Sequence, residues 1–297
     1  MKESPSDPAQ RATELGLGTA VFLPAYGVNG GVLTTTRPES LMKAAFSYGI
    51  RYIDTAAGYG SSEELLGRIS GLIDSHAVRI CTKLSPGQVP HGVEDSLERL
   101  RVGAVDTLLL HSASATDLLD AEVCEALSAA REVGLVRRLG ASTYGVDDAL
   151  LALRQNWCEV VQVECSILNP SVVDALAPVK KPGQEIVVRS VLVQGLLTGR
   201  NRPRAARFGS RADEITAEVE AQAVEWGMSL EQLAIRFALD QAAVDVVLVG
   251  VAEMSELEAA VSVLRLDPLD SEQLSVLERF DCSSEDWTHP ERWANTA

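Results

Sequence analysis

Basic residues are in short supply in this sequence. It has 26 lysines and arginines against 42 aspartates and glutamates, so its 297 residues carry a formal net charge of −16 at pH 7. Proteins that bind the phosphate backbone of nucleic acids, or the surface of an anionic membrane, need broad cationic surfaces. The charge balance therefore argues against nucleic acids and membranes as partners.

Cysteine and histidine are also scarce, and neither is grouped. The five cysteines include no Cys-x-x-Cys pair and are odd in number, so we expect reduced thiols and a cytoplasmic location rather than a disulfide framework. The four histidines are scattered without the spacing of metal ligands. This pattern argues against a zinc site, and we expect no bound metal.

Long apolar runs are missing as well. None approaches the ~20 residues of a membrane-spanning helix, and the polar stretch 1–13, with two prolines, does not resemble a signal peptide. We expect residues 1–13 to form a disordered tail. A dinucleotide-binding Gly-x-Gly-x-x-Gly motif is lacking, because Val21 stands where a third glycine would follow Gly16 and Gly18.

Short apolar segments, by contrast, are frequent and alternate with amphipathic helical patterns. Eight of them predict buried strands of an α/β fold, at 15–22, 50–53, 78–83, 105–111, 136–141, 160–164, 186–191 and 246–249. Eight alternations without a Gly-rich phosphate turn favour a (β/α)8 TIM barrel over a doubly wound open sheet. We expect one barrel domain over residues 14–297, which includes an extra C-terminal helix at 274–280 and a tail.

Polar side chains follow three consecutive strands of this predicted barrel. Asp54 ends the strand that begins at Ile50, and Tyr59 lies in the Gly-rich loop behind it. The next strand ends with Lys83, and the one after it ends with His111. Because parallel strands end at one rim of a barrel, where such folds place their active sites, these four side chains are predicted to meet.

The order of Asp-Thr-Ala, Tyr, Lys and His at successive strand ends resembles the aldo-keto reductases. The resemblance covers most of the chain and implies a nicotinamide-dependent oxidoreductase that reduces an aldehyde, ketone or sugar to an alcohol. It further implies that Tyr59 donates the proton, that Lys83 eases its release, that Asp54 holds Lys83 and that His111 orients the carbonyl. Each residue taken alone could equally be structural.

The resemblance also implies a set of cofactor contacts. The segment 189–199 is similar to the family's pyrophosphate loop, and Ser142 and Gln162 match its carboxamide ligands, although Thr143 stands where the family has asparagine. The implied cofactor-binding residues are Thr19, Asp54, Ser142, Thr143, Gln162, Arg189, Ser190, Val191, Leu192, Gln194, Gly195, Leu197, Gly250, Glu253 and Glu256. Arg189 stands where many members of the family have an aromatic residue that stacks on the nicotinamide. A guanidinium can also stack on this ring, and the alternative role for Arg189 is a rim cation paired with a carboxylate.

Charges after the last strand bear on the choice between NADH and NADPH. Many relatives have an arginine near the position of Ala252, and that arginine holds the 2′-phosphate of NADPH. Ala252 offers no such cation, and Glu253 and Glu256 would repel the phosphate. We therefore expect NADH to bind at least as well as NADPH. The counter-argument comes from five arginines in the segment 200–211, because Arg200, Arg202 or Arg204 could fold over the adenosine ribose and supply the missing cation. The same segment could instead be a solvated loop, or could clamp the cofactor pyrophosphate or a phosphorylated or nucleotide-linked substrate.

Two other functions remain open at this point. The barrel could bind a nucleotide as a regulatory or partner subunit, or could use the Tyr59 and Lys83 pair as acid and base in non-redox chemistry. Trp287 and Trp293 near the C-terminus are large apolar side chains that must be shielded from water. We expect them to pack against the barrel rather than to line a substrate pocket. The sequence leaves the substrate, the oligomeric state and the direction of reaction undetermined.

Overall fold

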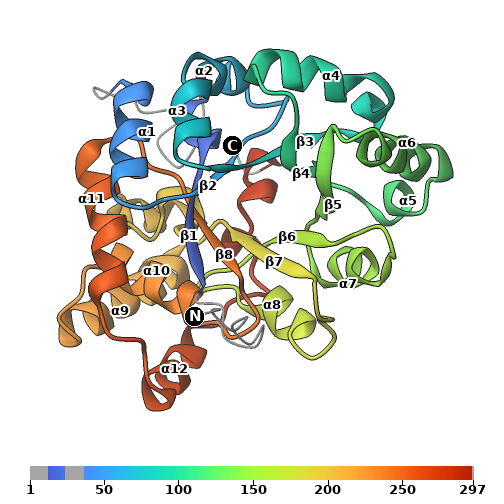
Figure 1. Cartoon of the computed structure of the whole chain (residues 1–297). Coiled ribbons are helices and arrows are strands. Elements are labelled where there is room, and N and C mark those ends of the chain that lie inside the picture. The colour runs from blue at the N-terminus through green and yellow to red at the C-terminus, as the bar shows by residue number, and fades with distance from the viewer. Residues whose placement is uncertain (1–12, 24–36, 296–297) are drawn as a thin grey trace, which may run out of the picture.

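Eight parallel strands form a closed barrel in the computed structural model, which describes residues 13–23 and 37–295 (Figure 1). Each strand pairs with the next along the chain, and β1 pairs with β8. This closure confirms the predicted (β/α)8 barrel and excludes the open sheet. The strands are β1 Glu14–Gly18, β2 Tyr52–Asp54, β3 Arg79–Leu84, β4 Val105–Leu110, β5 Val136–Ser142, β6 Val160–Glu164, β7 Glu185–Arg189 and β8 Val246–Val249.

Helices surround the barrel on its outside, as Figure 1 shows. They are α1 Pro38–Ser47, α2 Ser62–Arg68, α3 Ser70–Ser75, α4 Val89–Leu100, α5 Ala115–Leu118, α6 Ala121–Glu132, α7 Val146–Arg154, α8 Ser171–Leu176, α9 Ser210–Glu225, α10 Leu230–Leu239, α11 Met254–Ser262 and α12 Ser271–Leu277. The predicted C-terminal helix at 274–280 is present as α12 and a 3-10 turn, Glu278–Phe280. Within the described residues, no helix is long and apolar enough to span a membrane.

Two layers of apolar side chains build the core. One fills the inside of the barrel, and the other lies between the strands and the helices around them. The inner layer comprises Tyr52, Cys81, Leu109, Val160, Val187, Val246 and Leu248. Gly140 on β5 is needed for strand contact, because a Cβ there would lie 1.9 Å from the carbonyl oxygen of Val160 on β6.

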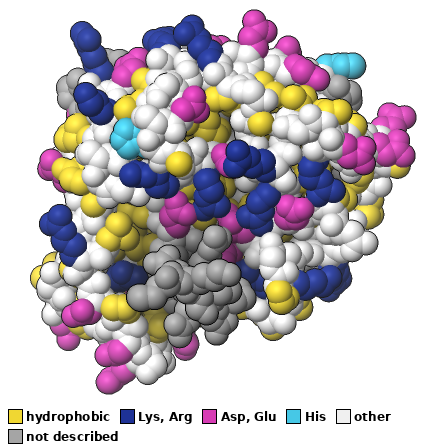
Figure 2. Space-filling view, in the orientation of Figure 1, with side chains coloured by type: hydrophobic (Ala, Val, Ile, Leu, Met, Phe, Trp, Pro, Cys, Tyr) yellow, Lys and Arg dark blue, Asp and Glu magenta, His cyan; other side chains and the backbone are white. Residues whose placement is uncertain are grey.

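A network of ion pairs joins side chains near the amino ends of several strands. Arg79 binds Glu14 at 2.6 Å and Glu185 at 3.4 Å, and Arg138 binds the same Glu185 at 2.5 Å. Figure 2 shows basic and acidic side chains interspersed across the middle of one face of the molecule. Because opposite charges within ~4 Å attract even at a partly solvated surface, the network helps to hold β1, β3, β5 and β7 in register.

Both ends of the described chain contact the barrel. The hydroxyl of Thr13 donates a hydrogen bond to the carbonyl of Val244, and residues 1–12 of the expected disordered tail lie outside the described residues. At the other end, the ring of Trp293 stacks on Phe208 with centroids 4.7 Å apart, and Trp287 is buried. These contacts match the packing role expected for the two tryptophans.

Candidate active site

Lys83 is the centre of a polar cluster at the carboxyl ends of β2 and β3. Its ammonium donates to Oδ2 of Asp54 at 2.6 Å and to the carbonyl of Thr55 at 2.8 Å, and lies 3.5 Å from the hydroxyl of Tyr59. The Lys83 side chain is fully buried. A buried ammonium must have charged or polar partners, because its desolvation is otherwise too costly. The end of β2 and the loop that follows it provide all three partners.

The charges around Tyr59 act in opposite directions on its acidity. Burial of the phenol raises its pKa, while the nearby cations Lys83 and Arg189 lower it, and burial prevails. For Lys83, burial is the largest effect and would lower the pKa, but the charge of Asp54, its hydrogen bond and the nearby Tyr59 and Cys81 together raise the pKa above its usual value. Lys83 is thus a permanent cation at neutral pH, and Tyr59 is a protonated phenol.

His111 follows β4 directly and faces the same phenol. Its ring meets that of Tyr59 edge to face, with centroids 5.5 Å apart and planes at 81°. Burial, together with the positive charge of Lys83, lowers the pKa of His111 to about 4. The imidazole is therefore neutral at neutral pH and has one N–H to donate. The four side chains predicted to meet at one rim do meet there.

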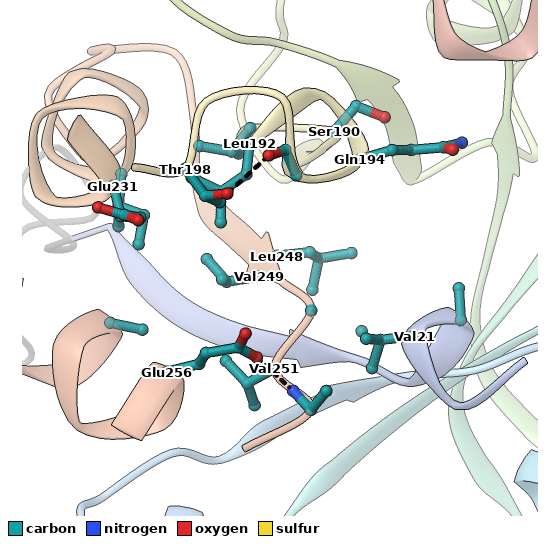
Figure 3. Close-up of a pocket in the computed structure, with 18 of the residues that line it drawn as sticks. Val21, Ser190, Leu192, Gln194, Thr198, Glu231, Leu248, Val249, Val251 and Glu256 are labelled. Atoms are coloured by element: carbon teal, nitrogen blue, oxygen red, sulfur yellow. Dashed lines mark hydrogen bonds between the residues drawn. The ribbon is translucent and has the colours of Figure 1, made fainter. Parts of the chain in front are cut away.

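A cavity of about 530 Å³ extends away from this cluster. Asp54 and Tyr59 line it, and so do the loop that follows β7, the end of β8 and the beginning of α11. In Figure 3, Leu192 and Thr198 approach the cavity from one side and Val251 and Glu256 from the other. A volume in the range of ligand pockets that adjoins a proton donor suits a bound organic cofactor.

The backbone of the loop after β7 is strained. Ser190, Val193 and Gln194 have positive φ angles of 61°, 46° and 48°, which side chains disfavour and which is most unusual for β-branched valine. Such strain is concentrated at functional sites, and a turn that alternates right-handed and left-handed residues can point its amides at an anion. Ser190 and Gln194 both line the cavity, and their contact with a pyrophosphate stays a prediction.

Comparison with known proteins decides the family. Residues 14–281 match the model of the "Aldo/keto reductase family". The chain belongs to this family. Among its curated relatives, an L-galactose dehydrogenase of Arabidopsis thaliana is 27% identical over 80% of this chain and 82% of its own, and an NADH-specific methylglyoxal reductase of Escherichia coli is 26% identical over 68% and 71%.

Solved structures agree on the fold. An aldo/keto reductase from Klebsiella pneumoniae, in complex with NADP and acetate, superposes with a TM-score of 0.68 at 22% identity, over 90% of this chain and 91% of its own. As a member of the family, this chain is a nicotinamide-dependent oxidoreductase of carbonyl compounds, as the order of strand-end residues predicted. The geometry of the individual residues decides how it does so.

The polar residues expected at the carboxamide are engaged with one another in this reductase. Gln162 donates to Oδ1 of Asp54 at 2.7 Å and accepts a hydrogen bond from Ser142 at 3.2 Å. Both are buried. The hydroxyl of Thr143 is buried and has no hydrogen-bond partner among the described residues. In this structure, therefore, Gln162 fixes Asp54, so that both carboxylate oxygens have a partner.

Arg189 is held by protein groups on several sides. Its guanidinium lies over the ring of Tyr144, 4.1 Å from the centroid, donates to the carbonyl of Thr143 at 2.7 Å and lies 3.6 Å from Glu164. The pairing with Glu164 matches the alternative in which Arg189 is a rim cation paired with a carboxylate. Arg189 also lines the cavity, so stacking on a bound nicotinamide stays a prediction.

The other predicted cofactor residues divide into two groups. Val191, Leu192, Gly195, Gly250 and Glu256 line the cavity. The remaining three lie elsewhere: Thr19 is buried and donates to the hydroxyl of Thr55, Leu197 is buried, and Glu253 caps α11. These three side chains do not line the cavity, because Thr19 is hydrogen-bonded to Thr55, Leu197 packs in the core and Glu253 caps a helix.

Several cavity residues escaped prediction. Ala20, Val21, Ser229 and Glu231 line the cavity. Ser229 begins a capping box with Gln232, and that Ser-x-x-Gln pattern announces a helix start in the sequence. Nothing in the pattern shows that the helix start faces the loop after β7. No cluster of possible metal ligands occurs among the residues that the structure describes.

Proposed function

We propose that this reductase transfers a hydride from a nicotinamide cofactor to the carbonyl carbon of a small aldehyde, ketone or sugar, while Tyr59 protonates the oxygen. The observation that carries the proposal is the contact of a buried, charged Lys83 with both Asp54 and Tyr59 at the cavity wall. When bound, the cofactor supplies the hydride. The protein residues supply the proton, its electrostatic control and the orientation of the oxygen.

The proton moves from Tyr59 as negative charge develops on the substrate oxygen. The ammonium of Lys83, 3.5 Å from the phenol oxygen, stabilises the phenolate that forms. Asp54 and the carbonyl of Thr55 keep that ammonium in place. Neutral His111, packed against the Tyr59 ring, donates a hydrogen bond that directs the carbonyl oxygen toward the phenol.

The cavity fits an elongated dinucleotide. The hydride must be delivered beside Tyr59, so the nicotinamide half belongs at the end lined by Asp54, Tyr59 and Arg189. The strained loop with Ser190 and Gln194 follows and would present backbone amides to the pyrophosphate. The adenosine half is then directed toward the start of α11, where Glu256 lies.

We propose NADH rather than NADPH as the preferred cofactor. Glu231 and Glu256 both line the far end of the cavity, where their carboxylates can accept hydrogen bonds from ribose hydroxyls but repel a phosphate. The relatives include both choices, one named NADH-specific and one solved with NADP.

Five unpaired cysteines support the expected cytoplasmic location.

We propose an uncharged carbonyl substrate rather than a phosphorylated or nucleotide-linked one. Two arginines of the segment 200–211 are already neutralised, since Arg200 binds Glu256 at 2.8 Å and Arg211 binds Glu285 at 3.4 Å. Residues 202–208 form a 3-10 helix rather than an open loop. The segment thus gives little support to a phosphate clamp.

The test combines cofactor binding with a single substitution. Titration of the pure protein with NADH and NADPH, followed by nicotinamide fluorescence, should show binding of at least one of them. Tyr59→Phe should keep that affinity and lose about 10²-fold to 10⁴-fold in single-turnover reduction of a working carbonyl. The exposed Tyr48 provides a matched control, since Tyr48→Phe should leave the rate unchanged. Failure to bind either cofactor, or a Tyr59→Phe rate within a few-fold of the parent, would refute the proposal.

A further inference from the structure

An ion pair joins the two walls of the cavity at its far end. Arg200, which follows the strained loop, donates to Oε1 of Glu256 at 2.8 Å. Glu256 lies in the first turn of α11 and accepts, through its other oxygen, the backbone amides of Ala252 at 2.8 Å and Glu253 at 3.3 Å. Figure 3 shows Glu256 extending toward the cavity from its helix, with the bond to the Ala252 amide dashed.

Three donors hold the Glu256 carboxylate, whose side chain is 33% exposed. A guanidinium, two backbone amides and the beginning of a helix all favour a negative charge at this point. They would favour an external phosphate in the same way if Glu256 were absent. The protein has therefore built an anion position at the cavity wall and filled it with its own carboxylate.

The position matters because of where it lies along the cavity. The end lined by Tyr59 must hold the reacting ring, so an elongated nicotinamide dinucleotide extends its adenosine ribose toward the end lined by Arg200 and Glu256. Ser255 and Glu231 line this end as well. A ribose hydroxyl can donate to Glu256 without breaking its other bonds, whereas a 2′-phosphate would have to displace it.

We propose that Glu256 determines the cofactor specificity of this enzyme by occupying the anion position that Arg200 and the start of α11 would otherwise offer to the 2′-phosphate of NADPH. This inference rests on the proposed function. Glu256 neutralises Arg200 and adds a like charge facing the phosphate, so a single residue both removes the attraction and adds the repulsion. The carboxylate of Glu231 on the opposite wall cannot donate a hydrogen bond to a phosphate. It accepts a hydrogen bond from the backbone amide of Gly199 at 2.8 Å.

Glu256→Gln tests the proposal with little change in shape. The amide oxygen of glutamine can still accept hydrogen bonds from the backbone amides of Ala252 and Glu253, but the side chain no longer neutralises Arg200. We expect the affinity for NADPH to rise so that the ratio of NADPH to NADH affinity increases at least about tenfold at low salt, the change expected when one like-charge contact near a surface is removed. The increase should shrink as ionic strength rises.

Two further variants separate the contributions. Glu258→Gln removes the same charge from an exposed position of the same helix and should leave the ratio unchanged. Glu256→Gln combined with Arg200→Gln should lose most of the gain in NADPH affinity, because the freed guanidinium is then missing. Each dissociation constant is measured by nicotinamide fluorescence at two salt concentrations, so the readout does not require turnover.

The outcomes distinguish this inference from the function on which it rests. If the parent binds neither cofactor, the proposed function fails. If the parent binds NADH but Glu256→Gln changes the affinity ratio less than twofold, the function stands and the role of Glu256 is refuted. A parent that strongly prefers NADPH, with Arg200→Gln abolishing the preference, would also overturn the inference, because Arg200 would then already be free to hold the phosphate.

Discussion

Removing His111 should reduce the acid sensitivity of the fold. In the native state, burial and the charge of Lys83 lower the pKa of His111 to about 4 from its ordinary 6.5. As pH falls below 6.5, His111 of the unfolded chain binds a proton, whereas His111 of the folded protein stays neutral until the pH approaches 4. The stability of the folded protein therefore decreases down to about pH 4. This lowering of the pKa corresponds to a loss of stability of about 3.4 kcal/mol at most, and of about 2.5 kcal/mol at pH 4.5.

Urea unfolding at pH 7 and pH 4.5 measures this loss. The parent should lose about 2.5 kcal/mol more between these two conditions than His111→Gln, because carboxylate titration affects both proteins alike. The exposed His91 supplies the control: His91→Gln corrects for the loss of a histidine as such. The four histidines also allow NMR titration, in which the His111 resonance is identified by its absence from the variant.

A His111 resonance that titrates near pH 6.5 would contradict this prediction. Equal losses of stability in the parent and His111→Gln between pH 7 and pH 4.5 would contradict it as well. Either result would mean that the ring is better solvated than its contact with Tyr59 indicates. It would also mean that His111 becomes cationic in the range where the neutral donor is required.

Three shorter predictions follow from other contacts. Lys83→Met leaves Asp54 buried without its cation and should cost about 3–5 kcal/mol in unfolding free energy, with Asp54→Asn in the same chain restoring part of it; an equally stable single variant would contradict this. Gly140→Ala should cost at least about 3 kcal/mol by urea unfolding, because its Cβ would lie 1.9 Å from a β6 carbonyl oxygen, whereas Gly103→Ala, with open space, should be nearly neutral. Carbonyl reduction should be constant through neutral pH and fall above it, and alcohol oxidation should rise with pH, since burial raises the pKa of Tyr59; steady-state rates in both directions check this.

The strands could be predicted because their burial leaves a simple signal. The predicted strands at 160–164 and 246–249 coincide with β6 and β8, and β1, which ends at Gly18, is shorter than the predicted 15–22. The apolar run in the sequence continues beyond the end of the strand at Gly18, because residues 19–22 form a 3-10 turn whose apolar side chains pack near the cavity. Apolar periodicity alone cannot separate a strand from the turn that extends it.

The site shows a similar division. Asp54, Lys83 and His111 could be placed because each stands at a strand end, and parallel strands put their ends at one rim. Ser229, Glu231 and the pairing of Arg200 with Glu256 could not, because they depend on how the start of α10, the start of α11 and the loop after β7 approach one another. The way these three elements come together depends on side-chain packing over the whole barrel. No local sequence pattern predicts that packing.

Tyr59 illustrates why the net effect of neighbours has to be weighed rather than listed. A nearby ammonium alone makes a phenol more acidic, and the sequence supplied that argument for Lys83. In the folded protein the same burial that brings Lys83 close also removes water from the phenol, and this desolvation outweighs the cation, so the pKa is raised. The consequence favours reduction: Tyr59 enters the reaction protonated at neutral pH, and Lys83 acts mainly once negative charge passes from the substrate oxygen to the phenol. The cation therefore serves the transition state more than the resting enzyme, which is the condition for a charge to increase the rate.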